Sequence, residues 1–428
     1  MSNRPTSFRW VICALLFGAT TINYIDRQIL SLLKPVFEKE MGWTNEQFGY
    51  LNSLFQGAYA LSLLGFGWFI DRYGTKLGYA VSIASWSVAA AGHALASTFG
   101  GFAAWRVALG LGEGGNFPAA VKTVAQWFPA RERPVATTLF NSGANVGALV
   151  APATIPFIAA AWGWQWAFII AGALGLLWII AWWAFYSAPR DSRFANAAEC
   201  DHIEAGSPTV ANETPIPWLS LLGQRGAWSF IVAKLLTDPV WWFFLIWLPG
   251  YFHDVYGTDI KGSAPMLVTL YGIVTVLSIA GGWLSGRLAA LGWSVTATRK
   301  ASMALFACCV LPILLVPRFH DPWIAVALIG LAGAAHQAWS ATIFTTVSDL
   351  FPKRAVASVV GMGGMAGALG GMAFPIVTGL LLDHYKAAGS IAAGYDVLFY
   401  GCSSAYLVAF ALNHLLAPRF EPVELHRG

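Results

Sequence analysis

Charged side chains are scarce in this chain of 428 residues, in which Asp, Glu, Lys and Arg make up 11% and hydrophobic residues 57%. Soluble domains contain about 25% charged residues, so the composition excludes a protein whose whole surface faces water. The formal net charge is only +4, and no cluster of basic residues indicates a nucleic-acid partner.

Cysteine is also rare, and the motifs of metal-dependent and hydrolytic enzymes are missing. The five cysteines lack metal-ligand spacing, and four lie in apolar runs, where we expect them to pack rather than to form disulfides. There is no HExxH zinc pair, no GxSxG motif and no pair of aspartates in the middle of the apolar runs. We therefore expect no catalytic residues, no metal and no cofactor, which leaves the alternative of an intramembrane enzyme without a recognisable site.

The chain does contain a series of apolar runs, each of the about 20 residues that a helix needs to cross a bilayer. Twelve can be marked, at 10–33, 47–70, 77–97, 100–123, 134–158, 163–186, 225–249, 264–288, 299–317, 322–346, 355–382 and 393–417. They predict an all-α membrane protein with twelve transmembrane helices in contact with lipid. The first run contains Asp26 and Arg27, so we expect a membrane helix there and not a signal peptide.

One long polar stretch separates the sixth run from the seventh. We interpret residues 189–222 as a cytoplasmic linker between a six-helix bundle of residues 1–188 and another of residues 223–428. Sixteen Lys and Arg residues fall in the connections on the side of the N-terminus, and five fall on the other side. Because positively charged connections remain in the cytoplasm, we expect a multi-pass protein of the cell (inner) membrane with both termini cytoplasmic.

The two halves of the sequence repeat each other. Residues 123–131 (TVAQWFPAR) match residues 346–354 (TVSDLFPKR) at an offset of 223, and the same offset superimposes Pro152 on Pro375. Repeats in the same direction, six helices apart, imply two halves related by an axis along the membrane normal. We therefore expect the substrate site between the halves, near the middle of the membrane.

The connection after the second run carries a signature. Residues 67–76 (GWFIDRYGTK) resemble the loop between the second and third helices of the major facilitator superfamily. The resemblance implies a conformational latch formed by Asp71, Arg72 and Lys76, although an ordinary solvated loop remains the alternative. One departure is Gly286, which stands where the second half would repeat the acid of Asp71.

Further segments narrow the resemblance. Residues 23–27 (NYIDR), together with Arg106 and Glu113, resemble the anion:cation symporter family. Residues 237–249 (TDPVWWFFLIWLP) and 336–340 (HQAWS) are similar to its bacterial hexuronate transporter branch. The resemblance covers nearly the whole chain and implies a twelve-helix transporter of an organic anion that works by alternating access.

Six charged side chains lie well inside apolar runs. Each costs about 2.5–3.5 kcal/mol at a helix centre on insertion scales, so we expect them to face a cavity or one another. Three are basic and three acidic, which leaves the empty site neutral: Arg27, Arg106, Lys234, Asp26, Glu113 and Asp238.

The depth of these residues predicts their partners. Asp26 and Arg106 lie about 10 Å from the outer ends of their helices, so we expect them to form a structural ion pair. Arg27 then aims inward as a clamp for a substrate carboxylate, because guanidinium forks onto two carboxylate oxygens. Glu113 is the expected proton carrier, because desolvation opposes its charged form. Structural roles remain open for both, as a second ion pair and as a packing acid.

A further set of side chains falls near the middle of the runs. Lys234 lies four residues before Asp238, so it either binds substrate or is neutralised by that carboxylate. The polar and aromatic candidates for a sugar-binding cavity are Tyr59, Asn141, Asn145, His336, Gln337 and Trp339. Each alone could equally well bond a neighbouring helix. Residues 110–115 fit GxGxxG, but no strand precedes them, so we expect close helix contact there and not nucleotide binding.

Together these features predict a monomeric secondary transporter that imports a sugar acid by proton symport. The resemblance implies a hexuronate, such as galacturonate or glucuronate. The alternatives are another organic anion (an aldonate, an aldarate or another carboxylate), exchange in place of symport, Na+ as the coupling ion, or an anion channel.

Overall fold

The computed structural model describes residues 5–129, 132–205 and 218–423, and helices are the only regular elements among them. The chain divides into two compact units. The N-terminal unit comprises Met1–Gly42 and Leu54–Ala211, and the C-terminal unit comprises Trp43–Ser53 and Asn212–Gly428. Helix α3 (Asn45–Tyr73) therefore contributes residues to both units.

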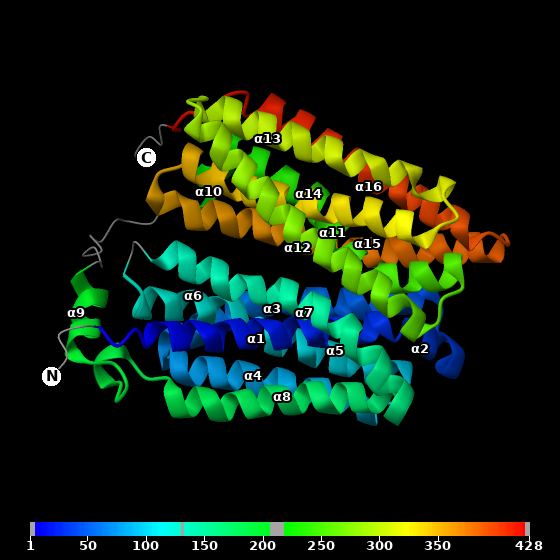
Figure 1. Ribbon diagram of the computed structural model, residues 1–428, viewed down its shortest axis with the longest axis horizontal. Coiled ribbons are helices and arrows are strands. Elements are labelled where there is room, and N and C mark those ends of the chain that lie inside the picture. The colour runs from blue at the N-terminus through cyan, green and yellow to red at the C-terminus, as the bar shows by residue number, and fades with distance from the viewer. Residues whose placement is uncertain (1–4, 130–131, 206–217, 424–428) are drawn as a thin grey trace. The chain divides into compact units, whose positions relative to one another are not determined.

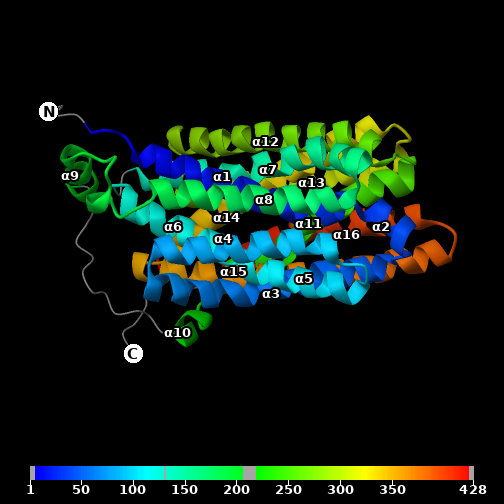
Figure 2. The same cartoon turned by 90° about the horizontal axis from the view of Figure 1, so that it is seen from below.

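The N-terminal unit holds the first six predicted membrane helices. Besides α3, its elements are α1 (Arg9–Leu32), α2 (Lys34–Met41), α4 (Thr75–Gly92), η1 (His93–Leu95), α5 (Phe99–Glu113), α6 (Asn116–Trp127), α7 (Arg133–Trp162), α8 (Trp164–Phe185), η2 (Pro189–Asp191) and α9 (Ala197–Ala205). Helices α1, α7 and α8 pack against one another, and α4 packs against α5 and α8 (Figures 1 and 2).

The C-terminal unit holds the other six. Its elements are α10 (Trp218–Leu222), α11 (Arg225–Tyr256), α12 (Ile260–Ala290), α13 (Val295–Val310), η3 (Leu311–Arg318), α14 (Pro322–Leu350), α15 (Lys353–Ala387) and α16 (Ile391–Leu416). Helix α11 packs against α15 and α16, and both α12 and α13 pack against α14.

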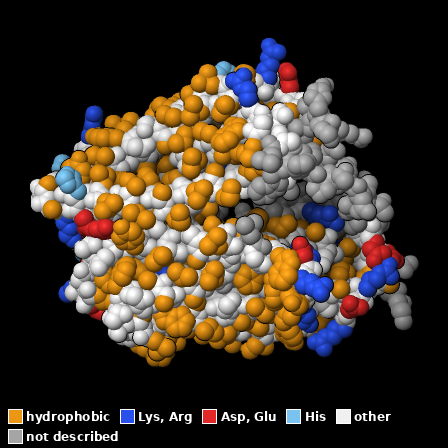
Figure 3. Space-filling view, turned by 180° about the vertical axis from the view of Figure 1, so that it is seen from behind, with side chains coloured by type: hydrophobic (Ala, Val, Ile, Leu, Met, Phe, Trp, Pro, Cys, Tyr) orange, Lys and Arg blue, Asp and Glu red, His pale blue; other side chains and the backbone are white. Residues whose placement is uncertain are grey.

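These helices confirm the predicted membrane architecture. Within the described ranges, nine helices are long and apolar enough to cross a bilayer. The other three predicted runs correspond to α1, to α4 and to the pair α5 and α6, where the chain breaks inside the run. Large apolar side chains such as Leu61, Ile180 and Ile279 are exposed, and the face in Figure 3 is mainly hydrophobic, with charged side chains at its margins. Such a surface indicates contact with lipid.

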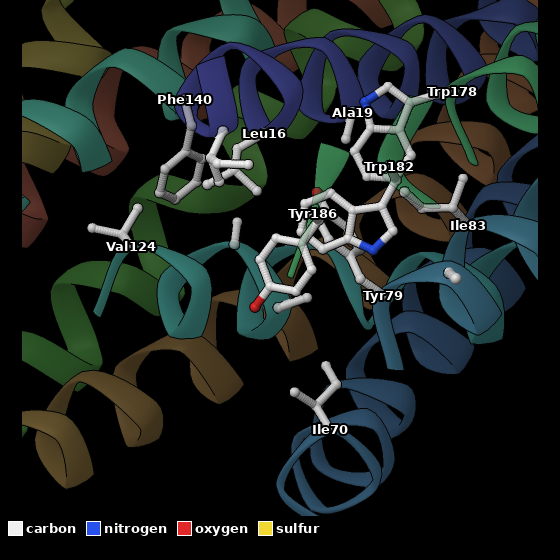
Figure 4. Close-up of a cluster of buried hydrophobic side chains, with 14 of the residues drawn as sticks. Leu16, Ala19, Ile70, Tyr79, Ile83, Val124, Phe140, Trp178, Trp182 and Tyr186 are labelled. Atoms are coloured by element: carbon white, nitrogen blue, oxygen red, sulfur yellow. The ribbon is translucent and has the colours of Figure 1, made fainter. Parts of the chain in front are cut away.

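Aliphatic and aromatic side chains together form the core of the N-terminal unit (Figure 4). Trp178 and Trp182 of α8 and Tyr186, the residue that follows the helix, lie four residues apart, and their rings stack with centroid separations of 5.1 and 3.9 Å. Trp178 Nε1 donates a hydrogen bond to the carbonyl oxygen of Leu15 (2.9 Å), and Trp182 Nε1 donates to that of Lys76 (3.1 Å). The stack therefore ties α8 to α1 and to the start of α4.

The first turns of α3 are built into the C-terminal unit. Asp383 of α15 accepts hydrogen bonds from the backbone N–H groups of Asn45 (3.1 Å) and Glu46 (2.8 Å). A carboxylate at this position satisfies donors that the helix itself cannot satisfy. Helices α3 and α15 also approach closely at Gly49. A Cβ atom at this position would collide with the carbonyl oxygen of Pro375.

Part of the predicted linker is folded onto the N-terminal unit. Element η2 and helix α9 lie within residues 189–205, and Ile203 belongs to the core cluster of that unit. Linker residues 206–217 lie outside the described residues, as do Arg4, Arg131 and Arg427, which entered the prediction of orientation.

Helix α9 supplies the N-terminal cap that α1 lacks. The capping residue Phe8 has no side-chain acceptor, but the buried carboxylate of Glu199 accepts hydrogen bonds from the N–H groups of Phe8 (2.9 Å) and Arg9 (3.0 Å). Burial alone would raise the pKa of Glu199, but hydrogen bonds from Thr6, from these two N–H groups and from the Arg9 guanidinium outweigh it and hold the pKa below its ordinary value. The charged carboxylate therefore stabilises this end of α1.

We predict that Glu199→Gln destabilises the protein in a pH-dependent way. Loss of a charged cap costs about 1–2 kcal/mol. At pH 7 the variant should therefore unfold in detergent at a lower midpoint temperature than the wild type. Because the folded-state pKa is depressed, the contribution of Glu199 is fully present above its unfolded-state pKa and is lost as the pH falls through the folded-state value. The difference between variant and wild type should therefore shrink at acidic pH. Glu204→Gln is the matched control, since Glu204 is exposed and pairs with the exposed Arg190. Equal effects of the two substitutions would contradict the capping role.

Candidate functional site

A break in the fourth membrane helix places Glu113. Helix α5 ends at Glu113, the chain turns at Gly114 and Gly115, and α6 begins at Asn116. Carbonyl groups near the break are satisfied by side chains, because Ser62 donates to the carbonyl oxygen of Leu111 and Ser82 to that of Gly112 (2.7 Å). Discontinuous helices are typical of binding sites within the membrane.

The glycines around this break allow close helix contact, as predicted for residues 110–115. A Cβ atom at Gly110 would collide with the carbonyl oxygen of Phe55 on α3, and one at Gly112 would lie 2.5 Å from the nitrogen of Trp86 on α4. Helix α5 is thus held between α3 and α4 at backbone contact, as small residues allow in membranes. This packing fixes the position of Glu113.

Arg27 and Glu113 form a buried ion pair. Arg27 Nε lies 2.6 Å from Glu113 Oε2, and the two side chains are 8% and 0% exposed. Aromatic rings flank the guanidinium, whose carbon lies 5.2, 5.4 and 4.5 Å from the ring centroids of Tyr24, Phe55 and Tyr59. The predicted clamp and the predicted proton carrier are therefore direct partners.

The predicted ion pair between Asp26 and Arg106 is wrong. Within the described part of the chain, neither carboxylate oxygen of Asp26 has a hydrogen-bond partner, although the side chain is buried. The guanidinium carbon of Arg106 lies 4.5 Å from the Phe55 ring centroid. Depth was the only basis of the prediction. Successive side chains of a helix point about 100° apart, so only one of the residues 26 and 27 can face Glu113. In the structure Arg27 faces it.

The C-terminal unit has a polar cluster of its own. Lys234 Nζ lies 2.8 Å from Asp238 Oδ2, one turn later on α11. The ring of His336 stacks on Trp241, with a centroid separation of 5.3 Å, and its Nδ1 bonds to the hydroxyl of Tyr406. Of the two readings of Lys234, the structure favours neutralisation by Asp238.

The remaining predicted residues are spread more widely. In the C-terminal unit, Trp339 is fully buried against the Tyr406 ring, and Gln337 is partly exposed. In the N-terminal unit, Asn145 is partly exposed and Asn141 is exposed. None of the contacts given above joins these four residues to the Arg27–Glu113 pair or to the Lys234–Asp238 pair.

The residues of the predicted latch lie at the junction of α3 and α4. Asp71 is exposed and pairs with Lys122 of α6 at 2.7 Å. Arg72 is exposed as well, and Lys76 lies over the ring of Trp183. The pair of Asp71 with Lys122 joins α3 to α6 within the N-terminal unit.

Sequence reasoning missed four residues that contact predicted site residues. Two could have been found from helical spacing, because Tyr24 lies one turn before Arg27 and Phe55 one turn before Tyr59. Trp241 lies inside a segment singled out for its resemblance, but no role was assigned to it. Tyr406 carries no local signal, because its contact with His336 joins helices 70 residues apart in sequence.

Buried ion pairs inside membrane helices mark pathways for ions or substrates, and the class of protein that this fold and site indicate is a membrane transporter. A sequence model of the Major Facilitator Superfamily matches residues 16–375, and the chain belongs to this family. It is 32% identical to the hexuronate transporter of Escherichia coli (strain K12), over 91% of this chain and 92% of the relative. It is 29% identical to the probable galactarate/D-glucarate transporter of Bacillus subtilis (strain 168), over 97% and 93%.

Solved structures agree on the fold. The structure of a bacterial homolog of the human lysosomal transporter Spinster, in an inward-facing and occupied conformation, superimposes with a TM-score of 0.75. The match covers 96% of this chain and 97% of that one at 16% identity, a level at which only the fold is shared.

We predict that Gly112→Ala disturbs the site while Gly100→Ala does not. The added methyl group must displace the backbone of α4 at Trp86, and overpacking of this kind costs about 1–3 kcal/mol. Gly100 lies on the same helix, and a Cβ atom there would meet nothing within 4 Å. The midpoint of thermal unfolding in detergent measures the difference. Equal stability of the two variants would show that α5 is free to move away from α4.

Proposed function

We propose that this protein imports a sugar acid, a hexuronate such as galacturonate or glucuronate, by proton symport across the cytoplasmic (inner) membrane, with both termini in the cytoplasm. The observation that carries the proposal is the buried pair of Arg27 and Glu113 among aromatic rings. The named activities of the relatives, a hexuronate transporter and a galactarate/D-glucarate transporter, support sugar acids as the substrate class.

Arg27 is the group that recognises the substrate. A carboxylate of the substrate competes with Glu113 for the guanidinium, since both present oxygen acceptors to the same N–H donors. The rings of Tyr24 and Tyr59 beside the guanidinium offer flat surfaces against which the apolar face of a sugar packs. The site thus combines one fixed positive charge with aromatic walls.

Glu113 is the group that couples the proton. The charged side chains inside the membrane are three basic and three acidic, so one added carboxylate leaves a charge of minus one unless a proton enters with it. Protonation of Glu113 removes the competitor of the substrate at Arg27, so proton and anion bind cooperatively, and by linkage the anion raises the affinity for the proton. Asp26 is the second candidate, because an ionised carboxylate is costly at this depth when no described residue donates a hydrogen bond to it.

We predict that Arg27→Lys weakens hexuronate binding although the charge is kept. Lysine cannot form the forked contact, and loss of a charge-assisted hydrogen bond of about 1.5–3 kcal/mol corresponds to a roughly 10- to 100-fold weaker affinity. Titration calorimetry of the purified protein in detergent measures this. Arg419→Lys, at an exposed position of the C-terminal segment, is the control. Near-normal affinity of Arg27→Lys would return Arg27 to a structural role.

We predict that Glu113→Gln, which mimics the protonated acid, separates exchange from accumulation. In proteoliposomes the variant should keep hexuronate counterflow, which needs no net proton movement, and should lose uptake driven by a pH gradient. Glu421→Gln, at an exposed position, should keep both. Loss of counterflow as well would make Glu113 a structural or substrate-binding acid, and retained accumulation would move the coupling role to Asp26. Replacing Na+ by K+ in the same assay should change nothing, and a strict need for Na+ would refute proton symport.

A further inference from the structure

One face of α4 holds the break between α5 and α6 on both of its sides. Before the break, Ser82 Oγ donates a hydrogen bond to the carbonyl oxygen of Gly112 (2.7 Å). After the break, the Tyr79 hydroxyl donates to Oδ1 of Asn116 (2.6 Å), the first residue of α6. Tyr79 and Ser82 lie three residues apart and therefore on the same face of α4. This face thus binds the chain on either side of Glu113.

Only two residues separate Asn116 from Glu113. Gly114 and Gly115 lie between them, with φ/ψ angles of −61°/−18° and −81°/−14°. These are right-handed helical angles close to those of a 3-10 helix, so the chain passes from Glu113 to Asn116 in about one tight turn. A Cβ atom at Gly115 would lie 2.5 Å from Oγ of Ser82, so the turn is packed against α4 as well. A displacement of Asn116 therefore also moves Glu113.

The side chain of Tyr79 is itself held in place. It is fully buried, and its ring centroid lies 5.1 Å from those of both Trp178 and Trp182. Trp178 Nε1 in turn donates to the carbonyl oxygen of Leu15 on α1 (2.9 Å). The aromatic cluster therefore connects α1, the helix that carries Arg27, with the start of α6.

We infer that Tyr79 is a positioning residue of the proton-coupling site, which acts through Asn116 to keep the carboxylate of Glu113 against Arg27. The inference rests on the proposed function and adds to it a residue that contacts neither the proton nor the substrate. Without the Tyr79 hydroxyl the start of α6 is held less tightly, and the 2.6 Å contact between Arg27 Nε and Glu113 Oε2 is weakened. The ionised carboxylate then loses part of its stabilisation by the guanidinium, so Glu113 keeps its proton up to a higher pH.

The test is Tyr79→Phe, measured in two ways. Titration calorimetry in detergent gives the affinity for a hexuronate as a function of pH, and the pH at which this affinity is half lost should rise by about 0.4–1 unit, the effect of one hydrogen bond. Proteoliposomes give the ratio of uptake driven by a pH gradient to counterflow. This ratio should fall about 2- to 10-fold, because a proton that is released less readily couples less well to transport.

Tyr186→Phe is the matched control for loss of stability. The Tyr186 hydroxyl donates to Oε1 of Gln126 (2.7 Å), which also belongs to α6, and the Tyr186 ring stacks on Trp182. This variant therefore loses the same kind of hydrogen bond at the other end of α6, far from the break. It should lower the midpoint of thermal unfolding about as much as Tyr79→Phe does, but keep the pH midpoint and the uptake ratio of wild type.

Two further variants test the route from Tyr79 to Glu113. Asn116→Leu removes the acceptor and should reproduce both effects of Tyr79→Phe, and the double variant should add nothing, because both substitutions remove one and the same bond. In a Glu113→Gln background, Tyr79→Phe should leave the pH dependence of binding unchanged, since no titratable carboxyl group remains at position 113.

Each outcome has a defined meaning. The inference is overturned, and the proposed function left intact, by a wild-type pH midpoint and uptake ratio in both Tyr79→Phe and Asn116→Leu, or by equal changes in Tyr186→Phe. A shift of the midpoint toward acidic pH, or a shift that persists in the Glu113→Gln background, overturns it as well. If wild type neither exchanges a hexuronate nor accumulates one under a pH gradient, the proposed function fails and the inference fails with it.

Discussion

The contact between Arg27 and Glu113 is the interaction on which the site depends. It holds an always-charged guanidinium and a titratable carboxyl together in a place that water hardly reaches, with 8% and 0% of the side chains exposed. Each charge would be costly there without the other. On the proposed mechanism this constraint is useful, because a substrate carboxylate replaces Glu113 as the partner of Arg27 only when Glu113 has lost its charge.

The backbone is arranged to keep that contact in place. Glu113 stands at the end of α5, where glycines bring the helix to backbone contact with α3 and α4, and Ser62 and Ser82 satisfy the carbonyl groups beside the break. An unbroken helix would need no such support. The break therefore requires close glycine contacts and two serine hydrogen bonds, and it fixes the carboxyl group of Glu113 against Arg27.

The buried charges are paired differently in the two units. In the N-terminal unit the ion pair joins two helices, α1 and α5, so it responds to any movement between them. In the C-terminal unit Lys234 and Asp238 lie on one helix, a turn apart, so their separation is nearly independent of helix movement. At position 336, which repeats Glu113 at the offset of 223, stands His336, whose ring bonds to the hydroxyl of Tyr406. The repeated fold thus carries different chemistry in each half.

The sequence by itself determined the class of fold and the set of charged residues in the membrane. Length, hydrophobicity and the cost of charge in lipid act locally, so runs of apolar residues suffice to predict twelve helices, and six interrupting charges stand out. The pairing of those charges was decided by tertiary structure, because it depends on the rotation of each helix about its axis. A rotation of about 100° per residue separates Asp26 from Arg27, and no pattern within α1 tells which of them faces α5. The packing of α1 against α7 settles that choice, because Gly143 and Gly147 of α7 lie against the carbonyl oxygens of Phe17 and Thr21, and these contacts join residues far apart in the chain.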